Sequence, residues 1–306
     1  MKKISFILAL ALLLSFSLVA CTSDSAPASE APAAAPSAAD VPSEPAVGGA
    51  DGQIVMACEA TFPPYEYMSG TEVVGIDVDI ANEIAKELNR ELIIEEMPFD
   101  SVIASVSTGK ADFAASGLSV TPEREEQVDF SIEYAVSKQV IMTRSDSGIT
   151  SPEELTGSVG VQLGTTGDLE LSDSEAYPDV TVERYNKYTD AVNDLISGRL
   201  NAIVMDSLPA EELKTMDESL VILEESLLDD SYAIAVQKGN DELLDAINKV
   251  LQRLIDEGTI DQFTMNHLTS AESSGEAIES EQEAASDVSS APVSSEVSSA
   301  SLSEAA

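Results

Sequence analysis

The stretch SGLSVTPEREEQVDFS, residues 116–131, places one arginine directly after a run of small and hydroxyl residues. The chain carries 56 acidic and 15 basic residues, so a cation at this position calls for an explanation. Arg124 is flanked by Glu123 and Glu125, which is typical of a solvated helix with local ion pairs. A guanidinium also matches a carboxylate, because its planar fork can donate two parallel hydrogen bonds. The rest of the chain has to decide between these two interpretations.

The local sequence predicts where this arginine lies. Thr121 is a good helix N-cap and Pro122 suits the first helical position, so Arg124 falls in a first turn, near backbone N–H groups that attract anions. The preceding run ADFAA, residues 111–115, is typical of a short strand. Ligands of parallel α/β sheets bind beyond the carboxyl ends of the strands. The stretch therefore predicts a strand end and a helix start at a ligand-binding edge.

Strands and helices alternate around this stretch. Short apolar runs predict strands, and apolar residues at helical spacing, such as Ile80 and Ile84, predict a helix. Two prolines predict a loop in FPPYEY, residues 62–67. Asp100 is expected to cap the second helix, which Gly109 ends. The alternation predicts a parallel sheet with covering helices; its strands are residues 53–60, 91–99 and 111–115, and its helices are residues 77–88 and 101–109.

The same pattern recurs later in the chain. SVSTGKADFAASG, residues 105–117, and DLISGRLNAIVMD, residues 194–206, both show a helix end, a glycine, a base and a strand. They indicate either two lobes of related build or a generic α/β junction, and the two-unit layout holds in both cases. Thr189 is expected to cap a helix that Gly198 ends. The next predicted elements are a strand followed by a glycine turn within 157–168 and strands at 180–185, 200–205 and 231–239. A last helix, residues 241–263, could return to the first lobe.

If the two lobes face each other, their strand ends converge on one cleft, a common place for small-ligand sites. Arg124 could hold a carboxylate and Asp206 an ammonium. Hydroxyls, free backbone N–H groups and flat apolar rings would complete the site. This set describes a zwitterionic α-amino acid; its further members are Ser116, Ser119, Thr165, Thr166, Phe62 and Phe99.

Each member also has a simpler interpretation. Asp206, followed by Ser-Leu-Pro, could merely cap the next helix, and Thr165 and Thr166 could be turn residues. Phe62 and Phe99 could be core residues. The hypothesis therefore depends on all of them falling at strand ends.

Charge and cysteine usage narrow the function class. A formal net charge of −41 argues against nucleic-acid binding, because phosphate recognition needs clustered Lys and Arg. Cys58 lies in an apolar run and is expected to be a buried, inert thiol. The chain has a single histidine, His267, so no metal cluster or Ser/His or Cys/His pair can be assembled. We expect no metal, no other cofactor and no enzymatic activity.

The two ends of the chain have compositions unlike a folded domain. Residues 1–20 combine Lys2 and Lys3 with an apolar run, which predicts a signal peptide. LVAC, ending at Cys21, resembles the lipobox of bacterial lipoproteins and predicts lipidation of this cysteine. Residues 21–50 are rich in Ala, Ser and Pro and predict a disordered tether; residues 271–306 predict a disordered acidic tail.

Five motifs together resemble the bacterial extracellular solute-binding proteins of family 3, the polar amino-acid binding components of ABC importers. They are FPPYEY, GIDVDIANEIAKEL, SGLSVTPEREEQVDFS, VGVQLGTTG and SGRLNAIVMDS, in family order across residues 53–268. The resemblance implies a type II periplasmic-binding-protein-like fold: two α/β lobes, a two-strand hinge, and closure around the ligand. Lobe 1 would be residues 51–142 plus 230–270, and lobe 2 residues 143–229.

The resemblance implies a role for each matching residue. Arg124 would bind the α-carboxylate of the ligand, together with the backbone N–H groups of Ser119 and Thr166. Asp206 would take the α-ammonium, with the Gly117 carbonyl and the Ser119 hydroxyl. Phe62 would stack on the ligand side chain, and Phe99, Gln162 and Thr165 would border the pocket. Two departures, Glu133 in place of a frequent proline and Phe99 in place of a frequent tryptophan, leave the class intact but blur the specificity.

Glu59 is the residue on which ligand specificity turns. With Asp206 serving the ammonium, Glu59 is a spare negative charge in a closing cleft, which is costly unless it is paired. We therefore expect a basic amino acid, arginine or lysine, with glutamine next. The expected partners are a free amino acid, an ABC transporter permease and the membrane. We expect a monomer outside the cytoplasm, anchored through Cys21 to the outer face of the cytoplasmic membrane, or in the periplasm. A sensor and a periplasmic dehydratase on the same fold are the alternatives.

Overall fold

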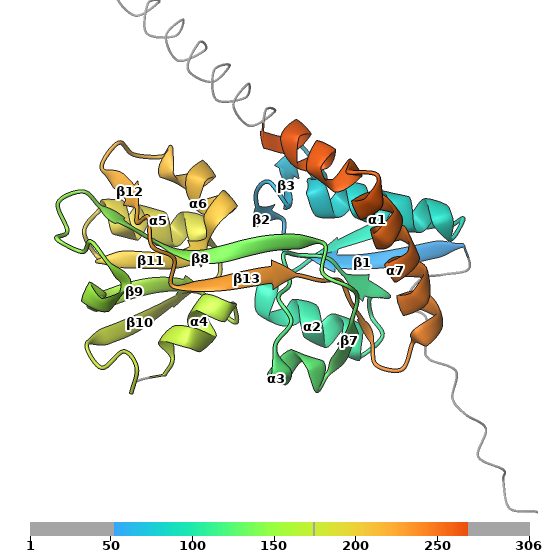
Figure 1. The fold of residues 1–306 in the computed structure, drawn as a ribbon, viewed down its shortest axis with the longest axis horizontal. Helices are drawn as coiled ribbons and strands as arrows, with labels where there is room; N and C mark the ends of the chain where they lie inside the picture. Colours follow the sequence, from blue (N-terminus) through green and yellow to red (C-terminus); the bar gives the residue numbers. More distant parts are fainter. Residues whose placement is uncertain (1–51, 174, 269–306) are drawn as a thin grey trace, which may run out of the picture. The chain divides into compact units, whose positions relative to one another are not determined.

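The computed structural model describes residues 52–173 and 175–268, and these residues form two α/β lobes. Figure 1 shows one sheet with its helices in blue to green and red, and the other in green to orange. The predicted bilobal fold is confirmed. The signal peptide, Cys21 and the tether, and the acidic tail, lie outside the described residues. Among the described helices, none is long and apolar enough to cross a membrane.

The first sheet has the strand order β5-β1-β6-β14-β7. Strand β1 pairs in parallel with β5 and β6, whereas β14 pairs antiparallel with β6 and β7. The three strands expected from the alternation pair in parallel, as predicted, and the sheet is mixed because β14 joins it antiparallel. Its strands are β1 (Gln53–Cys58), β5 (Glu91–Glu96), β6 (Phe113–Ala114), β7 (Val128–Phe130) and β14 (Ala235–Gln237).

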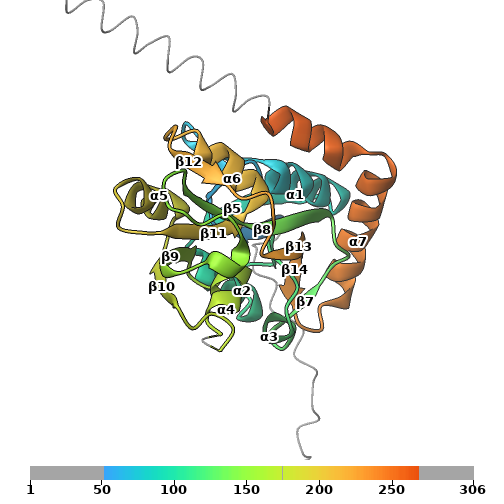
Figure 2. The same ribbon diagram turned by 60° about the vertical axis from the view of Figure 1, so that its left-hand side comes forward.

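Alternate residues of β1 face different helices, as the two-residue period of a strand requires. Ile54, Met56 and Cys58 pack with residues of α1 (Ile76–Glu87) and α7 (Asp241–Asp256). Val55 and Ala57 pack with α2 (Phe99–Ser107). In Figure 2, α1 and α7 lie on the side of the sheet away from α2. After a turn at residues 257–258 the chain is helical again over 259–268.

The second sheet has the order β10-β9-β11-β8-β12, and β13 also pairs with β8. Buried residues of α5 and α6 share one core with residues of the first lobe, and α4 packs on the other face. The elements are β8 (Ala135–Arg144), β9 (Gly157–Gln162), β10 (Val180–Tyr185), β11 (Ala202–Asp206), β12 (Leu220–Ile222), β13 (Leu228–Tyr232), α4 (Thr166–Leu171), α5 (Tyr188–Ile196), α6 (Ser207–Lys214) and a 3-10 turn, η1 (Pro152–Glu154).

The long antiparallel strands β8 and β13 form the connection between the two sheets (Figure 1). The first sheet ends at Phe130 of β7, and β8 pairs with the second sheet from Ala135. The chain passes back from the second sheet to the first between Tyr232 of β13 and Ala235 of β14. The single strand predicted for residues 231–239 is therefore two strands in different sheets. The lobe limits at 142/143 and 229/230 stay a prediction, although β8 already belongs to the second sheet.

Three local predictions differ from the structure. FPPYEY is not all loop, because Phe62 and Glu66 belong to a small antiparallel sheet of β2 (Thr61–Phe62), β3 (Glu66–Ser69) and β4 (Glu72–Val74). Helix α2 begins one residue before Asp100, which makes no capping hydrogen bond. Helix α5 begins before Thr189, and its N-cap is Lys187.

Candidate functional site

Residues from both lobes line one small cavity. Its lining is Phe62, Phe99, Gly117, Ser119, Arg124, Gln162, Thr165, Thr166 and Asp206, all of them in the predicted site. The remaining two predicted residues, Glu59 and Ser116, are buried and lie outside this lining. The structure thus brings the strand ends together; that these residues hold a ligand remains a prediction.

Arg124 is not a solvated helix charge. It lies in the short helix α3 (Pro122–Glu125), where the Thr121 side chain accepts a hydrogen bond from its backbone N–H, and the residue is only 7% exposed. Its guanidinium donates to the backbone carbonyls of Ser119 (2.6 Å) and Gly164 (3.0 Å), and lies 5.5 Å from the Phe99 ring centroid. Among the ion pairs of the described residues, none includes Arg124. A buried guanidinium that borders a cavity without a paired carboxylate can receive an anion.

Asp206 has the opposite charge on the same cavity. It occupies the N-cap position of α6, yet its side chain makes no capping hydrogen bond. Instead the carboxylate accepts hydrogen bonds from the hydroxyls of Ser137 (3.1 Å) and Tyr232. Burial raises the pKa of Asp206 to about 6, and the hydrogen bond from Tyr232 opposes this shift. The helix-cap interpretation is wrong, and the group is available to an ammonium.

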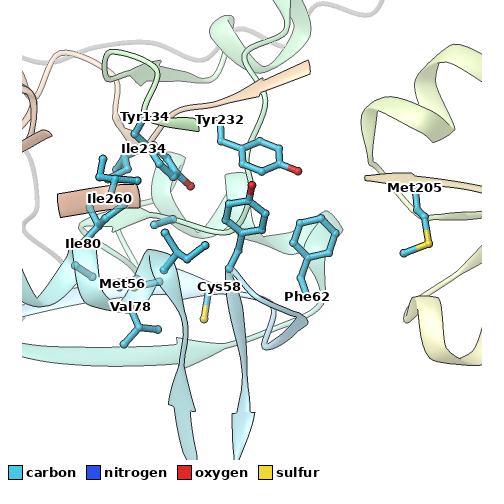
Figure 3. Packing of buried hydrophobic residues seen from close by; sticks show 14 of the residues in the cluster. Met56, Cys58, Phe62, Val78, Ile80, Tyr134, Met205, Tyr232, Ile234 and Ile260 are labelled. Atoms are coloured by element: carbon cyan, nitrogen blue, oxygen red, sulfur yellow. The ribbon is translucent and has the colours of Figure 1, made fainter. Parts of the chain in front are cut away.

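Gly117 lies directly against the Phe62 ring. Its φ is +53°, and a Cβ at this position would lie 2.7 Å from Phe62 Cε1. Its N–H donates to Asp77 Oδ2 (3.0 Å), which fixes the peptide. Phe62 is itself largely buried and packs against Tyr65, Tyr188 and Tyr232, at ring-centroid distances of 5.9, 6.3 and 6.5 Å. Figure 3 shows the Phe62 ring at the edge of this packing that faces Met205, so it is both core and cavity wall.

Buried carboxyls lie beneath the turn at Ser116 and Gly117. Glu66 is fully buried and accepts from Ser116 Oγ (2.8 Å), while Asp77 accepts from the Tyr134 hydroxyl (2.7 Å). Burial raises the pKa of Glu66 well above its usual range, and the charge of Asp77 adds to this. Burial also raises the pKa of Asp77 to about 6. The site prediction missed both acids, although FPPYEY and GIDVDIANEIAKEL contain them.

Glu59 lies at the end of β1, behind the cavity wall. Its N–H donates to Ser116 Oγ (3.0 Å), and one carboxylate oxygen accepts from Thr61. The other oxygen, Oε2, is buried and has no hydrogen-bond partner among the described residues. Burial raises the pKa of Glu59, and the nearby Gln162 side chain and Lys187 charge oppose the shift. An unpaired carboxylate oxygen here can accept a hydrogen bond from a donor that enters past Gln162.

The second-lobe wall is held by threonine hydroxyls. Thr165 caps α4, because its side chain accepts from the Asp168 N–H, and it also donates to the Gln162 carbonyl (2.9 Å). Thr165 is therefore a turn residue as well as a cavity residue. The Thr166 hydroxyl donates to Asp230 Oδ2 at 2.6 Å. Asp230 is a further residue that the site prediction missed, because nothing in its local sequence indicates the pairing of β13 with β8.

Comparisons with known proteins agree with this geometry. The family described as bacterial extracellular solute-binding proteins, family 3, matches residues 54–270. The arginine-binding extracellular protein ArtP of Bacillus subtilis is 32% identical over 71% of this chain and 86% of its own. The arginine-bound form of truncated ArgBP from T. maritima is 41% identical, with a TM-score of 0.63 over 67% of this chain and 97% of its own. An ancestral arginine-binding protein bound to glutamine is 35% identical, with a TM-score of 0.66, and the match covers 71% of this chain and 97% of its own.

Proposed function

Since the chain is a member of the bacterial extracellular solute-binding proteins of family 3, we propose that it binds a free α-amino acid by closure of its lobes and delivers it to an ABC transporter permease. One observation carries this proposal: Arg124 and Asp206 are buried, carry opposite charges and line the same cavity. Two such groups match the two charged ends of a zwitterion.

The proposed pose follows the cavity lining. Arg124 holds the α-carboxylate, with the backbone N–H groups of Ser119 and Thr166. Asp206 takes the α-ammonium, with the Gly117 carbonyl and the Ser119 hydroxyl. The ligand side chain then runs along Phe62 and Phe99 toward Gln162 and Thr165.

For the ligand side chain we propose a basic group, arginine or lysine, with glutamine next. The support is the unpaired Oε2 of Glu59, for which a guanidinium, an ammonium or an amide is a suitable donor. The names of the relatives agree: ArtP and ArgBP are called arginine-binding, and the ancestral protein was solved with glutamine.

We propose that the protein is a lipoprotein, located outside the cytoplasm and anchored to the membrane through Cys21. We also propose that it acts as a monomer. A catalytic role is disfavoured because the only histidine in the sequence, His267, contacts Asp79 (2.9 Å) and Tyr67 (3.1 Å) instead of the cavity. A sensor would use the same cavity, and genes for a permease beside this one would favour the importer.

A thermal-shift screen of the purified protein against the twenty amino acids tests the proposal. A ligand that binds the native state at a hundredfold excess over Kd raises the free energy of unfolding by about 2.7 kcal/mol. We expect the largest rise with arginine or lysine. A rise with glutamine alone would overturn the basic specificity, and no rise with any amino acid would overturn the function.

A further inference from the structure

The hinge strand β13 places a carboxylate against the cavity wall. Asp230 accepts two hydrogen bonds on Oδ2, from the Thr166 hydroxyl (2.6 Å) and from Gln139 Nε2 (3.3 Å). Its Oδ1 accepts from the Ser231 N–H (2.8 Å). Both oxygens are thus held in place, and one of them fixes a residue that lines the cavity.

The neighbouring residue on the strand has the opposite orientation. The Asp229 side chain is 86% exposed, and its ion pair with Lys138 is long, at 4.0 Å. Successive side chains of a strand point to opposite faces, so Asp229 faces water where Asp230 faces the cavity wall. Asp229 and Asp230 are therefore adjacent acids of equal charge, and only Asp230 contacts the cavity wall.

The charge of Asp230 reaches the ligand-binding groups. Burial lowers the pKa of Arg124, and the carboxylate of Asp230 is the strongest influence that opposes it. The same charge contributes to raising the pKa of Asp206, after burial. The charged groups around the cavity are then two cations, Arg124 and Lys187, of which Lys187 acts on Glu59, and three acids, Asp206, Asp230 and Glu59. A negative balance around a half-enclosed cavity favours a ligand with a net positive charge.

We propose that Asp230 is a specificity-determining and positioning residue, which fixes Thr166 on the cavity wall and favours a cationic ligand side chain over a neutral one of the same shape. This inference rests on the proposed binding of an amino acid in the cavity. The two roles are separable. The hydrogen bond to Thr166 acts on every ligand alike, whereas the charge acts on the difference between ligands of different charge.

Isothermal titration calorimetry with L-arginine and L-citrulline separates these roles, because citrulline replaces the guanidinium with a neutral group of similar shape. In Asp230→Asn the side-chain oxygen can still accept from Thr166 and Gln139, but the charge is gone and an amide NH2 replaces the oxygen that accepts from the Ser231 N–H. We expect the ratio of arginine to citrulline affinity to fall by roughly three- to tenfold. The matched control Asp229→Asn removes the same charge from the exposed face and should change the ratio less than about twofold.

Two further variants complete the design. Asp230→Glu keeps the charge and should keep most of the ratio of arginine to citrulline affinity. Asp230→Ala should lower the affinity for both ligands, because Thr166 loses its partner. The melting temperature of each variant shows whether it is folded.

The possible outcomes are distinct. An unchanged ratio in Asp230→Asn, or an equal fall in Asp229→Asn, would overturn the proposal. So would a wild-type protein that binds the two ligands equally well. A wild-type protein that binds neither these nor any other amino acid would overturn the proposed function itself.

Discussion

The hydroxyl of Tyr232, on the hinge strand β13, donates a hydrogen bond to the carboxylate of Asp206, at the end of β11. The same hydroxyl lies 3.0 Å from Ser137 Oγ on the other hinge strand, β8. The group proposed to receive the ligand ammonium is therefore tied to both strands that connect the lobes. In the proposed mechanism, ligand binding and lobe closure would therefore both act on these hydrogen bonds.

We expect Tyr232→Phe to weaken amino-acid binding and to change its pH dependence. The Tyr232 hydrogen bond lowers the pKa of Asp206, so its loss raises this pKa above about 6. Affinity should then fall more at pH 6 than at pH 8, where Asp206 is ionised in both proteins. Calorimetry at the two pH values measures this, and an equal fall at both would show that the hydroxyl does not act through Asp206.

In the wild-type protein, affinity should decrease as the pH falls below about 6. Asp206 must be ionised to hold an ammonium, and its pKa in the free protein is about 6. Affinity should therefore fall by up to about tenfold per pH unit below this value. Glutamine is the better titrant, because its side chain carries no charge toward Glu59. The neutral variant Asp206→Asn should bind weakly with a flatter profile; a wild-type affinity that is constant from pH 5 to 8 would contradict this role.

Glu66→Gln should make stability less dependent on pH. The pKa of Glu66 is raised in the folded protein, so the folded state binds more protons than the unfolded state above the unfolded pKa. The free energy of unfolding then falls as the pH rises from about 4.3 toward the folded pKa. The glutamine variant should lose less stability between pH 5 and pH 8 in urea denaturation. Glu72→Gln, at an exposed position, is the control and should leave the slope unchanged.

Gly117→Ala should destabilise the protein and weaken binding. A Cβ here would lie 2.7 Å from the Phe62 ring, and the residue has a φ of +53°. We expect a loss of about 1–3 kcal/mol in the free energy of unfolding. Gly70 has a similar φ of +64° but open space around it, so Gly70→Ala carries the backbone cost without the clash. Equal losses in the two variants would show that contact with Phe62 is unimportant.

The cavity could be predicted from the sequence because its residues stand at strand ends. Asp206 is the last residue of β11, and Arg124 lies in α3 after the end of β6, so each stands at the carboxyl-end edge of its own sheet. The type and order of most elements follow from apolar spacing in the same way. The glycines at 109 and 198 have positive φ after their helices, as expected of helix ends.

The hinge and the residues behind the cavity could not be predicted in this way. Nothing in AVSKQVIMTR or LDDSY, residues 135–144 and 228–232, indicates that these strands pair antiparallel or where the chain changes sheets. Asp230 and Tyr232 acquire their roles only through that pairing. The buried acids Glu66 and Asp77 look like ordinary surface charges in the sequence, because burial is a property of the packed lobe.

The most direct test of the central claim is calorimetric titration of L-arginine into the wild-type protein and into Arg124→Gln and Asp206→Asn. Removing one partner of a buried, hydrogen-bonded charge pair costs about 2–5 kcal/mol, so we expect one-to-one binding that weakens by roughly thirtyfold or more in each variant. Wild-type binding that survives unchanged in either folded variant would contradict the account.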